Sequence, residues 1–294
     1  MTGQLVAVLG RGVLERDEPI AYADDLGLTR GDGCFDATLV FAADGQSRRV
    51  LHLDPHVARL GRSAAALELE CPPAQEWNGL VAEAVSHPSA PPEECMLKLV
   101  LSRGREDHGG GVLGYLTVTP LPESSFDARR RGLHVASMDR GTAADAYAKA
   151  PWLLGGVKTI AYAINLAAKR EAEQRGAHEA LFVSADGYAL EAPTAALIVR
   201  HGDELVTTPT GPTGVLASVT IATTFEAAEK AGMYATHRLM RVSEVVDSDG
   251  AWLVSSVRGI APIRSLDGKE VPFDAEFHER LTELAGFPRF RAIQ

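Results

Sequence analysis

The chain has 294 residues, of which 46% are hydrophobic and 23% charged, and its formal net charge is −10 at pH 7. This length fits two domains of ordinary size, and a cleft between domains is the default place for chemistry. The negative charge argues against a nucleic-acid partner, because a phosphate backbone needs a basic surface. No apolar run approaches the roughly 20 residues of a membrane helix. The N-terminus MTGQLVAVLGRG lacks the pattern of a secretory signal, so we expect a cytoplasmic protein.

The cysteines and histidines do not form a metal-binding pattern. Cys34, Cys71 and Cys95 are far apart and include no CxxC, which disfavours both a disulfide framework and a structural zinc site. His52 and His56 are four residues apart, but the Asp-Pro step between them predicts that they do not share a helix face. We therefore predict free thiols and no metal.

The first part of the chain predicts a β-rich domain. An N-cap followed by proline, Asp54-Pro55, predicts a helix that runs through Leu67, and a second helix is expected near 75–86. Alternating or continuous apolar runs bounded by turn residues predict strands at 4–9, 37–42, 50–53, 96–104 and 114–122.

The second part mixes hairpins with helices. Apolar spacing predicts a helix within 160–176, and Ser218 is placed to cap another that ends near Lys230. Hairpins are predicted around Asp186-Gly187 and Gly202-Asp203. Further strands at 252–256 and 260–268 precede a final helix at 273–285. Because the strands and helices do not alternate strictly, we expect an α+β fold rather than a doubly wound parallel sheet.

A polar and basic stretch is the best candidate for a boundary between domains. PESSFDARRRG opens the segment 123–137, which we predict to be an interdomain connection. The expected organisation is therefore an N-terminal α+β domain at 1–122 and a C-terminal α+β domain at 138–294.

One lysine stands apart in a chain that is poor in lysine. Lys158 lies between GGV and TIAYAI, and apolar surroundings favour the neutral, nucleophilic form of an amine. Lys169, Lys230 and Lys269 have ordinary explanations in an amphipathic helix, at a helix end and after a turn. Lys98 is on a strand with an alternating pattern. Lys158 is thus the candidate for a catalytic amine.

Several blocks in a fixed order resemble the class IV aminotransferases. These blocks are GDGCFDATLV at 31–40, HVARLGRSAAAL at 56–67, the long stretch from VKTIAYAINL to DGYALE at 157–191, GVLASVT at 214–220, and WLVSS at 252–256. The resemblance covers nearly the whole chain. It implies the two-domain fold type IV of pyridoxal 5'-phosphate (PLP) enzymes, which is like that of D-amino acid aminotransferase, and a homodimer.

The resemblance also assigns roles to residues. It makes Lys158 the lysine that forms the Schiff base with PLP and carries protons. Glu191 matches the carboxylate that pairs with the pyridine nitrogen, which keeps the ring an acceptor of electrons. Arg59, in the HxxRL block, matches the arginine that binds the phosphate, since a guanidinium can pair with two oxygens at once. His56 is assigned no proton transfer.

Three further positions match phosphate contacts of the family. Val219 and Thr220 would offer backbone N–H groups at a helix N-terminus, and Thr220 also a hydroxyl. Ser256 matches the hydroxyl residue of the last phosphate-contacting strand. The sequence differs from the family pattern at two places. The run Ala192-Pro193-Thr194-Ala195-Ala196 replaces the residues that usually follow the glutamate, and Asp36 replaces a common Glu.

Within the family, the sequence is most like 4-amino-4-deoxychorismate lyase. GDGCF, KLVLSRG and SSVRGIAP resemble that branch, which implies conversion of 4-amino-4-deoxychorismate to 4-aminobenzoate and pyruvate in folate biosynthesis. The main alternative is a transaminase of D-amino acids or branched-chain amino acids, and a third is a relative that binds a ligand without catalysis. A small anionic amino compound is the expected substrate, and its candidate contacts are Phe35, Arg103, Arg105 and His108.

Overall fold

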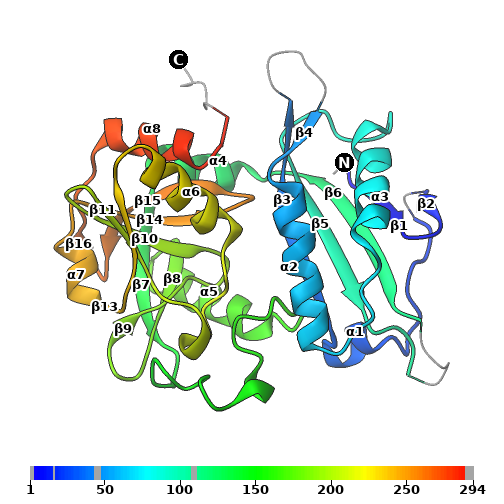
Figure 1. The fold of residues 1–294 in the computed structure, drawn as a ribbon, viewed down its shortest axis with the longest axis horizontal. Coiled ribbons are helices and arrows are strands. Elements are labelled where there is room, and N and C mark those ends of the chain that lie inside the picture. Colours follow the sequence, from blue (N-terminus) through cyan, green and yellow to red (C-terminus); the bar gives the residue numbers. More distant parts are fainter. Residues whose placement is uncertain (1–2, 16, 43–47, 107–110, 289–294) are drawn as a thin grey trace. The chain divides into compact units, whose positions relative to one another are not determined.

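The computed structural model describes residues 3–15, 17–42, 48–106 and 111–288. Its contacts divide the chain into two compact units. The first unit comprises Met1–Pro122 and Val157–Tyr162, and the second comprises Glu123–Gly156 and Ala163–Gln294. Each unit combines a sheet with helices (Figure 1), so the expected α+β class is confirmed.

The first unit is built on a six-stranded antiparallel sheet with the order β2-β1-β6-β5-β3-β4. Its strands are β1 (Leu5–Val8), β2 (Gly12–Val13), β3 (Gly33–Ala42), β4 (Arg48–Val50), β5 (Cys95–Ser102) and β6 (Leu113–Pro120). Its helices are α1 (Leu26–Arg30), α2 (Leu53–Ala66) and α3 (Ala74–Ser86).

Alternation along the strands separates the two faces of this sheet. Leu97, Leu99 and Leu101 of β5 point to a core that also contains residues of α2 and α3. Side chains of adjacent strand residues point to opposite faces, so Lys98 lies on the other face. Phe35 of β3 shares that face, because the residues beside it in β3, such as Cys34, belong to the helix-covered core.

The second unit contains a ten-stranded mixed sheet with the order β12-β11-β10-β14-β15-β7-β8-β9-β13, in which β16 pairs with β15. Its strands are β7 (Leu133–Asp139), β8 (Glu179–Val183), β9 (Tyr188–Ala189), β10 (Ala196–His201), β11 (Glu204–Thr207), β12 (Tyr234–His237), β13 (Met240–Arg241), β14 (Gly250–Ser255), β15 (Gly259–Leu266) and β16 (Lys269–Glu270). Its helices are α4 (Glu123–Arg131), α5 (Ala163–Gln174), α6 (Val219–Lys230), α7 (Val242–Val246) and α8 (Ala275–Leu284), with short 3-10 turns η1 (Pro151–Leu153) and η2 (Gly211–Thr213).

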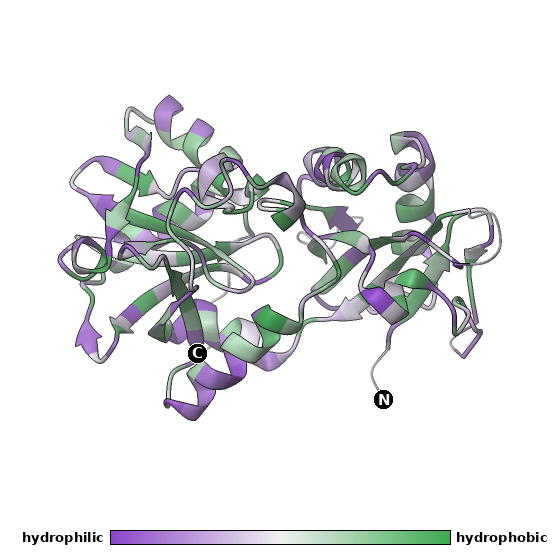
Figure 2. Ribbon diagram, turned by 90° about the horizontal axis from the view of Figure 1, so that it is seen from below, coloured by the Kyte–Doolittle hydropathy of each residue, from purple (hydrophilic) through white to green (hydrophobic). Residues whose placement is uncertain are grey.

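The apolar side chains of the strands form the core of this unit. Leu181, Leu197, Leu253 and Ile263 come from four different strands and are almost fully buried in one cluster. Many strand segments of both sheets are correspondingly coloured as hydrophobic in Figure 2. Among the described helices, none is long and apolar enough to cross a membrane.

Most predicted elements are present, and three differ. The run 50–53 was predicted as a strand, but β4 ends at Val50 and α2 already begins at Leu53, after His52 with a φ of 49°. Helix α5 begins at Ala163 rather than within 160–162, which leaves Tyr162 in a loop. The predicted connection 123–137 coincides with α4 and most of β7, and β7 pairs with β8 and β15. The predicted domain boundaries stay a prediction.

Candidate active site

Backbone hydrogen bonds fasten the Lys158 segment to the start of β3. The N–H of Phe35 donates to the carbonyl of Lys158 at 2.9 Å, and the N–H of Ile160 donates to the carbonyl of Gly33 at 3.0 Å. The N–H of Lys158 also donates to the Ser63 hydroxyl of α2 at 3.2 Å. The loop that carries this lysine is therefore held at defined positions by the first unit, although it follows residues of the second unit in sequence.

The side-chain amine of Lys158 lies among aromatic groups. Its Nζ is 4.5 Å from the centre of the Phe35 ring and donates to the hydroxyl of Tyr162 at 3.4 Å. The Tyr162 ring meets Phe35 edge to face, with 5.1 Å between ring centres. Lys158 and Tyr162 are half-buried. The apolar surroundings inferred for this lysine are thus present, and its hydroxyl neighbour was missed because 160–176 was predicted to be helical.

A second amine lies at the same aromatic ring. The Nζ of Lys98 is 4.6 Å from the centre of the Phe35 ring. Burial lowers the pKa of Lys98 below its ordinary value. Among the ion pairs of the residues that the structure describes, none includes Lys98. Sequence reasoning treated it as an ordinary strand residue, since the pairing of β3 with β5 that brings it to Phe35 is a long-range contact.

Arg59 is buried in α2 and pairs with Asp36 of β3. Its Nε donates to one carboxylate oxygen and its Nη2 to the other, both at 2.8 Å. Burial alone would raise the pKa of Asp36, but the hydrogen bonds from Arg59 and His56 outweigh it and hold that pKa well below its usual range. Arg59 is only 6% exposed, so it is not a solvated charge on the surface of α2.

Glu191 follows the β8–β9 hairpin in the second unit. Its carbonyl accepts from the N–H of Phe182 at 2.9 Å. Its side-chain oxygens both lie 3.3 Å from the N–H of Leu216, which precedes α6. The following Ala192 and Ala195 bond each other's backbone across a tight turn, so the departure from the family pattern forms a compact turn into β10.

The N-terminus of α6 and the end of β14 bring hydroxyl groups together. The Ser218 side chain accepts from the N–H of Ile221 at 3.2 Å, which confirms the predicted N-cap. Thr220 and Ser256 are buried, and their hydroxyl oxygens are 2.8 Å apart. Val219 and Thr220 are the first two residues of the helix, where backbone N–H groups have no partner within the helix. Such a group of donors suits an anion.

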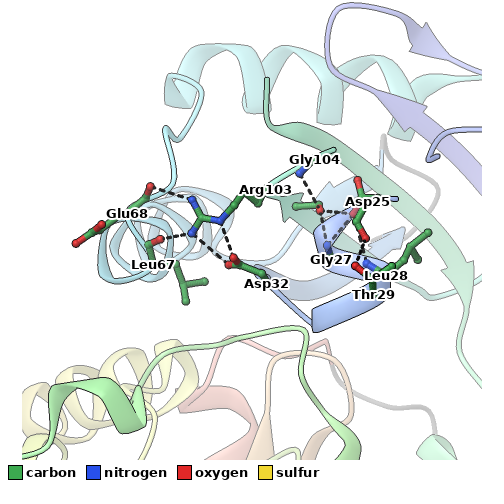
Figure 3. A network of polar contacts seen from close by, with 10 residues as sticks. Asp25, Gly27, Leu28, Thr29, Asp32, Leu67, Glu68, Arg103 and Gly104 are labelled. Atoms are coloured by element: carbon green, nitrogen blue, oxygen red, sulfur yellow. Dashed lines mark hydrogen bonds and ion pairs between the residues drawn. The ribbon is translucent and has the colours of Figure 1, made fainter. Parts of the chain in front are cut away.

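The predicted substrate contacts differ in what they bind. Arg103 donates to both oxygens of Asp32 and to the carbonyls of Leu67 and Glu68 (Figure 3). Leu67 is the C-cap of α2, and Glu68 follows it. Arg105 pairs with Asp24 at 2.9 Å.

The other two predicted substrate contacts are Phe35 and His108. Phe35 is buried against Lys158 and Tyr162, whereas His108 lies outside the described residues. The substrate roles of Phe35 and the two arginines stay predictions.

The donor set fits PLP. A phosphate needs N–H and O–H donors and positive charge. In the second unit, the start of α6 with the hydroxyls of Thr220 and Ser256 has donors of this kind, and in the first unit Arg59 has a guanidinium. An aldehyde needs an amine, which Lys158 supplies beside aromatic groups. A pyridine nitrogen needs a carboxylate, for which Glu191 is available.

The chain belongs to the class IV aminotransferase family, a family of PLP-dependent enzymes, whose sequence pattern matches residues 33–266. The chain is 35% identical over 275 residues to a Mycobacterium tuberculosis protein described as a bifunctional aminodeoxychorismate lyase and D-amino acid transaminase, with 91% of this chain and 93% of the relative covered.

Solved structures agree with this assignment. A PLP-bound aminotransferase from M. tuberculosis, described as hypothetical, has a TM-score of 0.90 and 34% identity, with 96% of this chain and 97% of that chain covered. A fold IV transaminase from Curtobacterium pusillum has a TM-score of 0.87 and 36% identity, with 97% and 100% covered. The fold type IV and the PLP cofactor predicted from the sequence are therefore confirmed.

Proposed function

We propose that the chain is a PLP-dependent lyase that converts 4-amino-4-deoxychorismate to 4-aminobenzoate and pyruvate. The observation that carries this proposal is the 35% identity, over nearly the full length of both chains, to a relative whose description includes that lyase activity. Transamination of D-amino acids is the second candidate, because the same relative's description includes it.

Lys158, Glu191, Arg59, Val219, Thr220 and Ser256 are the residues that we propose to hold the cofactor. When bound, PLP supplies a ring that withdraws electrons from the substrate carbon that bears the amine. Lys158 would take the covalent position, and Glu191 would pair with the ring nitrogen. The hydroxyls of Thr220 and Ser256, the first N–H groups of α6 and the Arg59 guanidinium would be the groups that bind the phosphate.

The chain's own groups account for the proton movements. As a neutral amine, Lys158 takes the proton from the amine-bearing carbon of the substrate at its Nζ. The Tyr162 hydroxyl, 3.4 Å from that nitrogen, orients the amine and can exchange a proton with it. The centres of the Phe35 and Tyr162 rings lie 4.5 and 5.6 Å from that nitrogen, so the two rings restrict the positions that the amine can occupy.

The overall lyase reaction is balanced without a second reactant. The carbon–oxygen bond to the three-carbon side group breaks, that group leaves as pyruvate, and the six-membered ring becomes aromatic. A transaminase would instead transfer the amino group and would need a keto acid as the second substrate. The two reactions therefore differ in their required reactants, which makes them separable by assay.

The deciding experiment is a paired assay on the purified holoenzyme. We expect pyruvate release from 4-amino-4-deoxychorismate without any added keto acid, and loss of that release in Lys158→Ala. If the enzyme releases no pyruvate but converts a D-amino acid in the presence of a keto acid, the lyase proposal is wrong and the transaminase is supported. If neither reaction occurs in a protein that holds PLP, both proposals fail.

We also propose a cytoplasmic homodimer. Its support is the resemblance to the family together with large apolar side chains on the surface, such as Trp152 and Ile164, each 75% exposed. Light scattering coupled to gel filtration measures the mass directly, and a monomeric mass at micromolar concentration would contradict the dimer.

A further inference from the structure

A buried carboxylate beneath the proposed phosphate-binding arginine has no role in the function described above. Asp36 is fully buried, on the face of β3 that α2 covers. It accepts four hydrogen bonds: from Nε and Nη2 of Arg59, from Nδ1 of His56 at 2.7 Å, and from the N–H of Ala37 at 2.8 Å. Such complete pairing fixes both the position and the ionised state of the carboxylate.

The pairing fixes the direction of the guanidinium. A guanidinium is planar, so two parallel hydrogen bonds to one carboxylate hold its whole plane and aim its remaining N–H groups. Asp36 occupies the edge formed by Nε and Nη2. Nη1 and the outer hydrogen of Nη2 are therefore directed away from Asp36. An arginine without such a partner would have several rotamers, and binding a ligand would cost the entropy of selecting one.

His56 holds the carboxylate from the other side. His56 and Arg59 are three residues apart on α2, so both side chains reach the same strand residue. Because an ionised carboxylate can only accept, the imidazole donates from Nδ1. Its Nε2 is buried, with no hydrogen-bond partner among the described residues, and burial lowers the pKa of His56. The lowered pKa of His56 favours the neutral ring, which orients Asp36 without adding charge.

We propose that Asp36 is a positioning residue, which with His56 aims Arg59 at an anionic phosphate monoester and so sets the affinity for the phosphate of the cofactor. This inference rests on the proposed role of Arg59 in phosphate binding. It assigns a specific purpose to two residues that contact neither the phosphate nor the reacting atoms in the proposal. Asp36 and His56 therefore affect the affinity for the phosphate of the cofactor and not the affinity for its ring.

The test compares two ligands that differ in the phosphate alone. The dissociation constants of PLP and of pyridoxal are measured by absorbance titration of the full-length apoprotein. Asp36→Asn is expected to weaken PLP binding by about tenfold or more and to change pyridoxal binding by less than about twofold, since only PLP uses Arg59. Thr38→Val is the matched control, because Thr38 is a buried polar residue of the same strand whose hydroxyl donates to the Leu51 carbonyl instead.

A double-mutant cycle keeps the test decisive if the single variant folds poorly. In Arg59→Gln, adding Asp36→Asn removes a buried charge that lacks its partner, so the double variant is expected to fold. If Asp36 acts through Arg59, then Asp36→Asn has no further effect on the ratio of PLP to pyridoxal affinity in that background.

The outcomes separate this inference from the proposed function. An unchanged affinity ratio in Arg59→Gln would overturn the phosphate role of Arg59 itself. A reduced ratio in Arg59→Gln with an unchanged ratio in Asp36→Asn would overturn only the positioning role of Asp36. Equal weakening of PLP and pyridoxal in Asp36→Asn would also overturn it, because that is the effect of a general structural defect.

Discussion

The hydroxyl pair at the N-terminus of α6 gives the sharpest prediction about the proposed phosphate site. Thr220→Val removes a hydroxyl and keeps the branched shape of the side chain, and Ser256→Ala removes the other. Both residues are at most 8% exposed, so no bulk water replaces the lost donor at low cost. A hydrogen bond to a charged group contributes about 1.5–3 kcal/mol. Each single variant should therefore weaken PLP binding by about 10-fold to 100-fold.

The 2.8 Å contact between the two hydroxyls predicts that their effects are not additive. Each hydroxyl orients the other, so removing one already weakens the contribution of its partner, and the double variant should lose less than the sum by about 0.5–1 kcal/mol. The assay is absorbance titration of the apoprotein with PLP. Thr223→Val is the control, since that hydroxyl bonds carbonyls of its own helix. Wild-type affinity in both single variants, or an equal loss in Thr223→Val, would refute the reasoning.

Three further predictions follow from other contacts. Tyr162→Phe should lower kcat with little change in PLP affinity, because it removes the hydroxyl beside Lys158; a pure loss of PLP binding would contradict this. Arg103→Met should lower the free energy of unfolding by about 1–2 kcal/mol in urea titrations, since it removes the partly exposed ion pair with Asp32 and the carbonyl contacts at the end of α2. An unchanged free energy of unfolding together with a raised KM would instead support a substrate role for Arg103. The low pKa of Asp36 contributes stability that is present above its unfolded pKa of about 3.9 and is lost as the pH falls below it. Wild type should therefore lose up to about 1.4 kcal/mol more per pH unit between pH 4 and 2 than the Asp36→Asn/Arg59→Gln variant, and parallel urea-unfolding curves would argue against it.

The sequence predicted those caps, turns, strands and helices that depend on residues close together in the chain. The Ser218 cap and the hairpin turn at Asp186-Gly187 are confirmed, because side-chain capping and turn chemistry act within a few residues. Alternation and apolar spacing predicted most strands and helices for the same reason. Helix α4 and strand β7, which occupy most of the polar segment 123–137, were not predicted. The arginines at the end of α4 gave no helical signal, and the strands that pair with β7 lie far away in sequence.

For the candidate site too, the sequence predicted features that depend on neighbouring residues and missed those that depend on long-range packing. The apolar flanks of Lys158 and the order of the motifs identified the lysine and the family. Lys98, Tyr162 and Asp36 were not identified as neighbours of site residues, because they come together through sheet pairing, a loop conformation and the packing of α2 on β3. Asp36 carried one signal, which is its departure from the common Glu, but its partner could only be found in three dimensions.

The most direct test of the central claim is to locate the lysine that binds PLP. The holoenzyme is reduced with borohydride, digested and examined by peptide mass spectrometry. We predict that the phosphopyridoxyl group is found on the peptide that contains Lys158, and that Lys158→Ala loses both this label and the visible absorbance of the cofactor. A label on Lys98, the neighbouring amine at the Phe35 ring, or no label at all, would contradict the assignment.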